Sequence, residues 1–215
     1  MQKPIILFED EQLVVGVKPR GVLSARDASD KLSMHDLLAP RTVFPIHRLD
    51  REVTGAMVFA KTAAAAAQLS TAMGNNFVKE YLALCESAPQ PDEGILEDLL
   101  FHDRFKNKTY IAKRKRAGVR DAQLVYHVLT HFSGGQAALH IRLLTGRTHQ
   151  IRVQLASRRC PICGDRKYGA KTGGTLELYA WRLTFPHPDG DTMRFTLPAE
   201  FLNDRLSAAV AEIPL

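Results

Sequence analysis

Five ionisable side chains stand within six positions in the segment His47-Arg48-Leu49-Asp50-Arg51-Glu52. The segment precedes residues 55–61, an apolar stretch that we expect to form a buried strand, and loops beside core strands often carry functional side chains. Asp50 lies between Arg48 and Arg51, and nearby cations favour the ionised carboxylate. Such a carboxylate can act as a base, a nucleophile or an ion-pair anchor. The same composition also suits a surface cluster of ion pairs at the start of a strand.

A second candidate site is residues 144–152, which read Leu-Thr-Gly-Arg-Thr-His-Gln-Ile-Arg. The segment stands where a predicted strand gives way to a predicted helix. Arg and Gln side chains, together with the free backbone N–H groups of a helix start, suit phosphates or the edges of nucleobases. The alternative interpretation is a helix that Thr148 caps and whose basic end is solvated.

A third candidate is the basic run of residues 106–120, which holds seven Lys or Arg and no acidic residue. Phe105 and Tyr110 are interleaved with these cations. Basic residues with aromatic rings among them are typical of RNA-binding surfaces, where affinity comes from phosphates and stacking. A solvated charged face is the alternative interpretation of the same run.

The sequence does not favour a metal or a nucleotide cofactor. Cys160 and Cys163 form one CxxC pair without a second ligand pair, whereas a structural zinc site normally takes four ligands. The glycines do not form a phosphate-loop or dinucleotide-binding pattern. We therefore expect neither bound metal nor ATP or NAD.

The apolar patterning predicts a strand-rich α+β chain with a mixed, mostly antiparallel sheet and flanking helices. Residues 24–41 are polar and allow one short helix, and residues 87–94 form the best candidate for an internal subdomain break. Predicted strands cover residues 5–8, 13–17, 55–61, 79–85, 123–132, 136–144, 176–185 and 193–197, and predicted helices cover residues 63–73, 149–157 and 200–212.

The composition bounds the class of protein. With 215 residues, a net charge of +6 and 45% hydrophobic residues, the chain suits one soluble domain spanning residues 1–215. Its basic balance favours a polyanionic partner. Three cysteines, an odd number, argue against a disulfide framework, and no stretch is long and apolar enough for a signal peptide or a membrane span. We expect a cytoplasmic protein.

Several segments, in order along the chain, resemble the motifs of the RluA-type pseudouridine synthases, over about residues 5 to 201. Val17 and Val53 are mild departures from the family pattern, and Cys160 and Cys163 are variants inside its H-P-I-x-G-D segment. The matching segments are Val17-Lys18-Pro19-Arg20-Gly21, His47-Arg48-Leu49-Asp50, Thr54-Gly55, Ala60-Lys61, Lys79-Glu80-Tyr81-Leu82-Ala83, residues 144–153, Gly164-Asp165, Tyr168-Gly169 and Phe185-Pro186-His187-Pro188.

The resemblance implies an isomerase that converts uridine in RNA to pseudouridine, on a mixed sheet with a central catalytic cleft and without cofactor or metal. The family's nucleophile maps to Asp50, and its base-packing tyrosine, implicated in proton transfer, maps to Tyr81. The arginine that pairs with the aspartate maps to Arg152, with Arg147 as the alternative. Arg48 maps to the arginine that helps to displace the target nucleotide.

We expect contacts with RNA from all three candidate segments. The expected residues are His47, Arg48, Arg147, His149, Gln150, Lys113, Arg114, Lys115 and Arg116. A chain that starts its first strand near Ile5 leaves no room for the extra RNA-binding module of many relatives, so the catalytic domain itself must recognise the target. The expected target is a stem-loop of tRNA or rRNA, and the expected state is a monomer.

Two other functions remain open. A non-catalytic RNA-binding protein on the same scaffold would be favoured if Asp50 or Tyr81 were replaced, and both are present. A metal-dependent nuclease or hydrolase would need more clustered carboxylates, and near Asp50 only Glu52 is close in sequence.

Overall fold

The computed structural model describes residues 4–74 and 76–211, which form two compact units. The first unit contains the described residues up to Lys79 together with Tyr179–Phe201. The second contains Glu80–Leu178 together with the described residues from Leu202 on. Each unit therefore combines two separate stretches of chain, and the division does not fall in residues 87–94, where the sequence suggested it.

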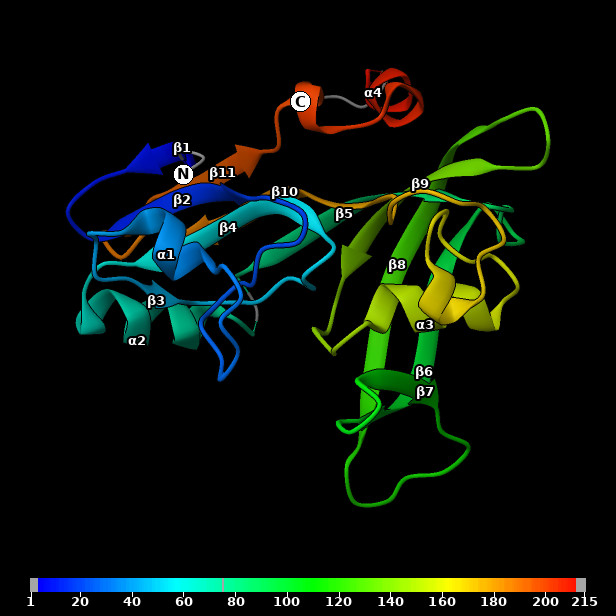
Figure 1. Ribbon diagram of the computed structural model, residues 1–215, viewed down its shortest axis with the longest axis horizontal. Coiled ribbons are helices and arrows are strands. Elements are labelled where there is room, and N and C mark those ends of the chain that lie inside the picture. Colours follow the sequence, from blue (N-terminus) through cyan, green and yellow to red (C-terminus); the bar gives the residue numbers. More distant parts are fainter. Residues whose placement is uncertain (1–3, 75, 212–215) are drawn as a thin grey trace. The chain divides into compact units, whose positions relative to one another are not determined.

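The first unit is a mixed sheet with short helices. Its strand order is β1-β2-β4-β10-β11, with β3 also paired to β4. Strands β4 and β10 run parallel, and the other pairs are antiparallel (Figure 1). The described elements are β1 (Ile5–Glu9), β2 (Leu13–Lys18), α1 (Met34–Leu38), β3 (Phe44–Pro45), β4 (Thr54–Ala60), α2 (Ala63–Ala72), β10 (Leu178–Pro186), β11 (Thr192–Thr196) and the 3-10 turn η2 (Ala199–Phe201).

Strand β4 forms the centre of the first unit, and all of its residues are buried. A strand covered on both faces reads as a continuous apolar run, as this one does. Gly55 allows β10 to approach, because a Cβ at this position would lie 2.4 Å from the Cβ of Ala180. The core around β4 includes Leu13, Val15, Val58, Leu69 and Phe185.

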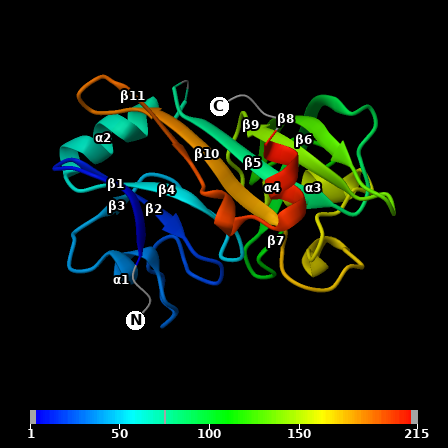
Figure 2. The ribbon, with the colours of Figure 1, turned by 90° about the horizontal axis from the view of Figure 1, so that it is seen from above.

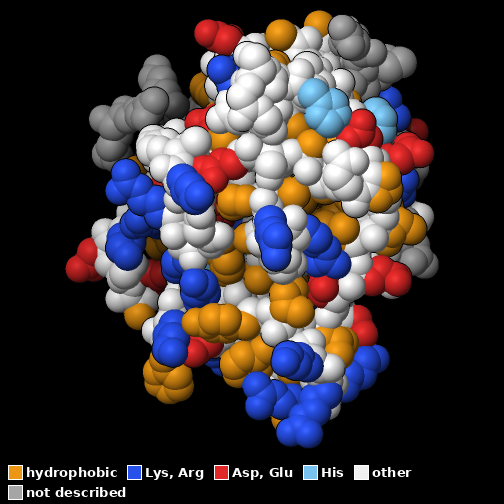
Figure 3. Space-filling model, turned by 90° about the vertical axis from the view of Figure 1, so that its right-hand side faces the viewer, with side chains coloured by type: hydrophobic (Ala, Val, Ile, Leu, Met, Phe, Trp, Pro, Cys, Tyr) orange, Lys and Arg blue, Asp and Glu red, His pale blue; other side chains and the backbone are white. Residues whose placement is uncertain are grey.

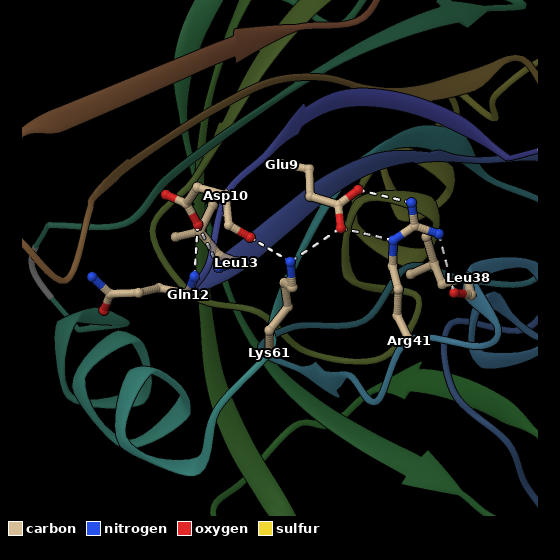
Figure 4. A network of polar contacts seen from close by, with 7 residues as sticks. All are labelled: Glu9, Asp10, Gln12, Leu13, Leu38, Arg41 and Lys61. Carbon is tan, nitrogen blue, oxygen red and sulfur yellow. Dashed lines mark hydrogen bonds and ion pairs between the residues drawn. The ribbon is translucent and has the colours of Figure 1, made fainter.

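A polar network joins the end of β1 to the segments that follow α1 and β4 (Figure 4). The Glu9 carboxylate accepts hydrogen bonds from Arg41 Nε at 2.9 Å and Nη2 at 2.8 Å, and from Lys61 Nζ at 3.1 Å. Hydrogen bonds from these two cations lower the pKa of Glu9 to about 2. Lys61 Nζ also donates to the carbonyl oxygen of Asp10. Lys61 of the Ala-Lys motif therefore serves as a tie between strands.

The second unit is a sheet with longer strands, in which the pairs β9–β8, β8–β6 and β6–β7 are antiparallel. Its strand order is β5-β9-β8-β6-β7. Helix α3 packs on β6 and β7, and α4 packs on β8 and β9 (Figure 2). The described elements are β5 (Val78–Cys85), β6 (Glu93–Asp103), β7 (Lys108–Ile111), β8 (Val119–His131), β9 (Ala137–Leu143), α3 (Gln150–Ser157), the 3-10 turn η1 (Arg166–Tyr168) and α4 (Asp204–Val210).

The predicted α+β class is confirmed, with its mixed and largely antiparallel strand pairing. The hairpin of β1 and β2 is confirmed, as is helix α2, whose Thr62 Oγ1 accepts a hydrogen bond from Ala65 N at 3.1 Å. Strands β6 and β7 are absent from the predicted set, because acids interrupt the apolar pattern of β6 and β7 lies inside the basic run. The terminal helix observed in the structure is α4, Asp204–Val210, which is shorter than the predicted helix of residues 200–212. Residue 212 lies outside the described residues.

Within residues 4–74 and 76–211, the structure contains no helix with the length and apolar character needed to cross a membrane.

Candidate functional site

Asp50 lies in the loop between β3 and β4, and hydrogen bonds fix the backbone on its amino-terminal side. Leu49 N donates to Ser24 Oγ at 2.9 Å, and Ser24 Oγ donates in return to the Leu49 carbonyl at 2.8 Å. Both residues are buried. The Asp50 carbonyl accepts a bond from Val53 N at 3.0 Å, which closes a turn. The half-buried Asp50 therefore stands on a fixed loop.

Lys18 fixes the backbone on the other side of Asp50. Its Nζ donates to the carbonyls of Arg51, Pro19 and Val22, each at 2.9 Å. The Arg51 carbonyl also accepts a bond from Gly21 N at 2.9 Å, in a turn where Gly21 has a φ of +80°. Lys18 is completely buried. We call Lys18, Gly21 and Ser24 the Asp50 clamp.

The Lys18 ammonium group is held in an unusual environment. Burial lowers the pKa of Lys18 from 10.5 to about 7, while the negative charges of Asp50 and Glu52 raise it. The ammonium form has three N–H donors, and three carbonyls accept them. The Asp50 carboxylate thus contributes to the charge balance of the lysine that fixes its own loop.

The arginines on either side of Asp50 lie at the surface. Arg48 is exposed, and Arg51 pairs with Glu52, with Nη2 and Oε1 2.8 Å apart. Both partners of this pair are well exposed, so the pair contributes little to stability. Arg48 is therefore accessible to a bound RNA, as its predicted role requires.

His47 is enclosed within the first unit. Its Nε2 accepts a hydrogen bond from Val58 N at 3.3 Å, and its ring lies edge-on to Phe77 with centroids 5.5 Å apart. Burial, and secondarily the charge of Lys79, lowers the pKa of His47 to about 3, so the imidazole is neutral. This position favours a structural role for His47 over the predicted contact with RNA.

In the second unit, Gln150 holds the loop that precedes α3. Its Oε1 accepts hydrogen bonds from Thr145 Oγ1 at 2.8 Å and from Arg147 N at 3.0 Å. Its Nε2 donates to the Gln123 carbonyl at 3.0 Å. Gln150 is buried, and these hydrogen bonds stabilise the loop. Arg147 is exposed, and its Nε donates to the Asp121 carbonyl at 2.9 Å.

His149 begins α3 in a left-handed conformation with a φ of +53°. The residue is buried, and its Nδ1 lies 2.9 Å from the hydroxyl of Tyr168. That hydroxyl also accepts a bond from Thr109 N at 2.8 Å, which ties β7 to η1. Non-glycine residues with positive φ often mark functional loops, and here the contacts of His149 stabilise the conformation.

Arg152 forms a buried ion pair with Asp165. The Nε–Oδ2 distance is 2.7 Å and the Nη2–Oδ1 distance is 2.8 Å. The guanidinium group also lies over the ring of Tyr168, with its Cζ 5.1 Å from the centroid. Two parallel bonds fix the direction of the guanidinium plane. Asp165 has no role assigned from the sequence motifs, although the Gly164-Asp165 segment is among them.

The other predicted residues of the second unit divide by exposure. Tyr81 is buried in β5, whereas all four residues from Lys113 to Arg116 are exposed in the loop after β7. Lys115 pairs with Asp121 at 3.1 Å, and the Arg116 Cζ lies 5.1 Å from the ring centroid of Phe101. Lys and Arg side chains gather at the lower end of the face in Figure 3.

The cysteines have no metal-binding arrangement in the part of the chain that the structure describes, where no group of three or more His, Cys, Asp or Glu is placed to hold an ion. Cys85, Cys160 and Cys163 are free and buried. Burial raises the pKa of each of the three thiols, which keeps them protonated.

Comparison with known proteins identifies similar sequences and structures. The model of the RNA pseudouridylate synthase family matches residues 12–157. The dual-specificity RNA pseudouridine synthase RluA of Salmonella typhimurium is 31% identical over 210 residues, which cover 92% of this chain and 94% of that protein. The ribosomal large subunit pseudouridine synthase D of Xylella fastidiosa is 32% identical over 224 residues, which cover 96% of this chain and 66% of that protein.

Two human structures share the fold. RNA pseudouridylate synthase domain containing 4 has a TM-score of 0.77 at 24% identity, covering 98% of this chain and 95% of that chain. RNA pseudouridylate synthase domain containing 1 has a TM-score of 0.79 at 22% identity, covering 96% and 87%.

The Asp50 clamp predicts a stability effect. Lys18→Met leaves three backbone carbonyls, that of Val22 buried, without the Lys18 donor and should lower the free energy of unfolding by about 1–3 kcal/mol at neutral pH. Urea denaturation measures the change, and Lys31→Met, at an exposed position of the same unit, should have almost no effect.

The same pair of variants gives a pH test. Because the pKa of Lys18 falls from 10.5 to about 7 on folding, the unfolded state binds more protons between these values, and the stability contributed by Lys18 rises with pH in this window. The deficit of Lys18→Met should therefore widen from neutral pH towards alkaline pH. A constant deficit would contradict the low pKa.

The buried ion pair predicts a second effect. Asp165→Asn removes the buried carboxylate charge that the Arg152 guanidinium binds through two hydrogen bonds and should destabilise the protein by about 3–5 kcal/mol. Asp121→Asn breaks the exposed pair with Lys115 and should cost at most about 1 kcal/mol. Equal shifts of the urea midpoint for the two variants would show that the buried Arg152–Asp165 pair contributes no more to stability than the exposed pair.

Proposed function

The chain belongs to the RluA-type family of RNA pseudouridine synthases and is an isomerase of uridine in RNA, and we propose that its targets lie in tRNA, rRNA or both. The family named from sequence motifs is thereby confirmed. Asp50 is the proposed nucleophile, with Tyr81 and Arg152 as the other catalytic residues. The proposal includes a monomeric enzyme in the cytoplasm that uses no metal or nucleotide cofactor.

The observation that carries this proposal is the Asp50 clamp. A carboxylate that must meet one sugar or one base needs a fixed backbone, since small misplacements reduce catalysis strongly. The hydrogen bonds from Ser24 and Lys18 fix the residues on both sides of Asp50. Such a double restraint is more than a surface cluster of ion pairs would need.

The reaction explains the residue types. The glycosidic bond must break, the uracil must rotate, and carbon 5 must bond to the sugar and later lose its proton. The Asp50 carboxylate starts this sequence, either by attacking the ribose or base or by assisting proton abstraction from the sugar. Tyr81 packs on the base and accepts or relays the carbon 5 proton.

The target base must leave its stack before the reaction, at a cost of a few kcal/mol. Arg48 is the proposed residue that takes the vacated place, and its exposed side chain supports this role. The exposed cations of residues 113–116 supply contacts to phosphates, and their exposure makes them accessible for this role.

Arg152 is the proposed cation that supports the Asp50 carboxylate, in preference to Arg147. The two bonds to Asp165 give Arg152 a fixed orientation in a buried setting. Arg147 is exposed, so water screens its charge. A preorganised buried cation stabilises a reacting anion more than a solvated one.

The function is tested by tritium release from cellular tRNA and rRNA labelled at carbon 5 of uridine. The wild-type protein should release tritium, and Asp50→Asn should release none above a protein-free control while it still binds the RNA. Urea denaturation of both proteins provides the folding control. An active, folded Asp50→Asn protein would overturn the assignment of Asp50. A folded wild type that releases no tritium would favour the alternative of a non-catalytic RNA-binding protein.

A further inference from the structure

A groove on the second unit lies among β7, α3 and η1, with a volume of about 480 Å³. Its lining includes the cations Lys108, Arg166 and Lys167 and contains no Asp or Glu. Tyr110 and Tyr168 add two aromatic rings. A groove of this composition carries a positive potential and offers flat apolar surfaces.

The aromatic and cationic groups lie close together. Lys108 Nζ is 5.8 Å from the ring centroid of Tyr110 and 5.4 Å from that of Tyr168. Tyr110 and Ile111 are among the exposed large apolar side chains, at 38% and 37% exposure. Stacking surface is therefore available directly beside a cation.

Hydrogen bonds and a ring contact hold the floor of the groove together. The Tyr168 hydroxyl is bonded to Thr109 N and lies 2.9 Å from His149 Nδ1, and the Arg152 guanidinium lies over the Tyr168 ring. These contacts fix η1 relative to β7 and α3. A ligand in the groove would consequently bind a preformed surface, which limits the entropic cost of binding.

We propose that this groove binds a single-stranded segment of the substrate RNA, with a base stacked on Tyr110 and phosphates held by Lys108, Arg166 and Lys167. The inference rests on the proposed function, because RNA is the substrate there. Basic grooves with exposed aromatic rings are the common mode of binding single strands, since every base has a face for stacking. An acidic peptide would satisfy the cations and leave the Tyr110 ring unused.

The basic loop follows the groove along the chain. Strand β7, which lines the groove, ends at Ile111, and the exposed residues Lys113 to Arg116 come after Ala112. An RNA strand that leaves the groove along β7 therefore meets further cations. The two groups of cations form one path for a phosphate backbone.

The test measures binding of a fluorescent ten-nucleotide oligouridylate by anisotropy over a range of KCl concentrations. The groove variant is Arg166→Glu/Lys167→Glu, and the matched control is Lys31→Glu/Arg194→Glu, which changes the net charge equally at exposed positions of the first unit. We expect the groove variant to bind at least about 10-fold more weakly than the control at about 50 mM KCl, with a salt slope lower by about 1.4 for two lost phosphate contacts.

Stacking is tested separately at Tyr110. Tyr110→Ala should weaken binding by about 5-fold or more, and Tyr110→Phe should bind like the wild type. Equal binding by the groove variant and the control, or no binding of the oligouridylate by the wild type, would overturn the proposal.

The dependence of tritium release on RNA concentration distinguishes this inference from the proposed function. The groove variant should need a higher RNA concentration for half-maximal tritium release than the control Lys31→Glu/Arg194→Glu, because its substitutions weaken RNA binding. If the wild type bound RNA through the groove but released no tritium, the isomerase activity would be refuted and the proposed RNA binding by the groove would still hold.

Discussion

The candidate site depends on one constraint, which is that the loop carrying Asp50 must keep a single conformation. The segment from Lys18 to Ser24 provides this restraint. Lys18 satisfies three carbonyls with one ammonium group, and Ser24 exchanges two bonds with Leu49. The burial of Lys18 is costly, as its lowered pKa shows, and the cost is understandable if it fixes the position of a reacting carboxylate.

The sequence motifs contain both residues that support the loops and residues that face solvent, and the residue types alone do not distinguish the two. Gln150 and His149 are polar and lie in a motif associated with RNA, yet both are buried and hydrogen-bonded within their unit. Arg48 and Arg147 come from the same motifs and are exposed. Only the fold distinguishes the residues that support the loops from those that face solvent.

Local signals predicted much of the fold. The apolar run of β4, the Thr62 cap of α2 and the hairpin of β1 and β2 are encoded within short segments. Strand β6 is different, because its acids hide the alternation and its pairing partner β8 is distant in sequence. The role of Asp165 was not predicted either, because it depends on an ion pair with Arg152, which lies in the preceding helix α3.

The central claim is that the clamp fixes the place of the Asp50 carboxylate, and the substitution Asp50→Glu tests it most directly. The variant keeps the carboxylate and moves it by one methylene group on an unchanged backbone. Single-turnover tritium release at saturating RNA should fall by at least about 100-fold, with folding and RNA binding retained. A rate close to that of the wild type would show that the position of the carboxylate is not what the clamp controls.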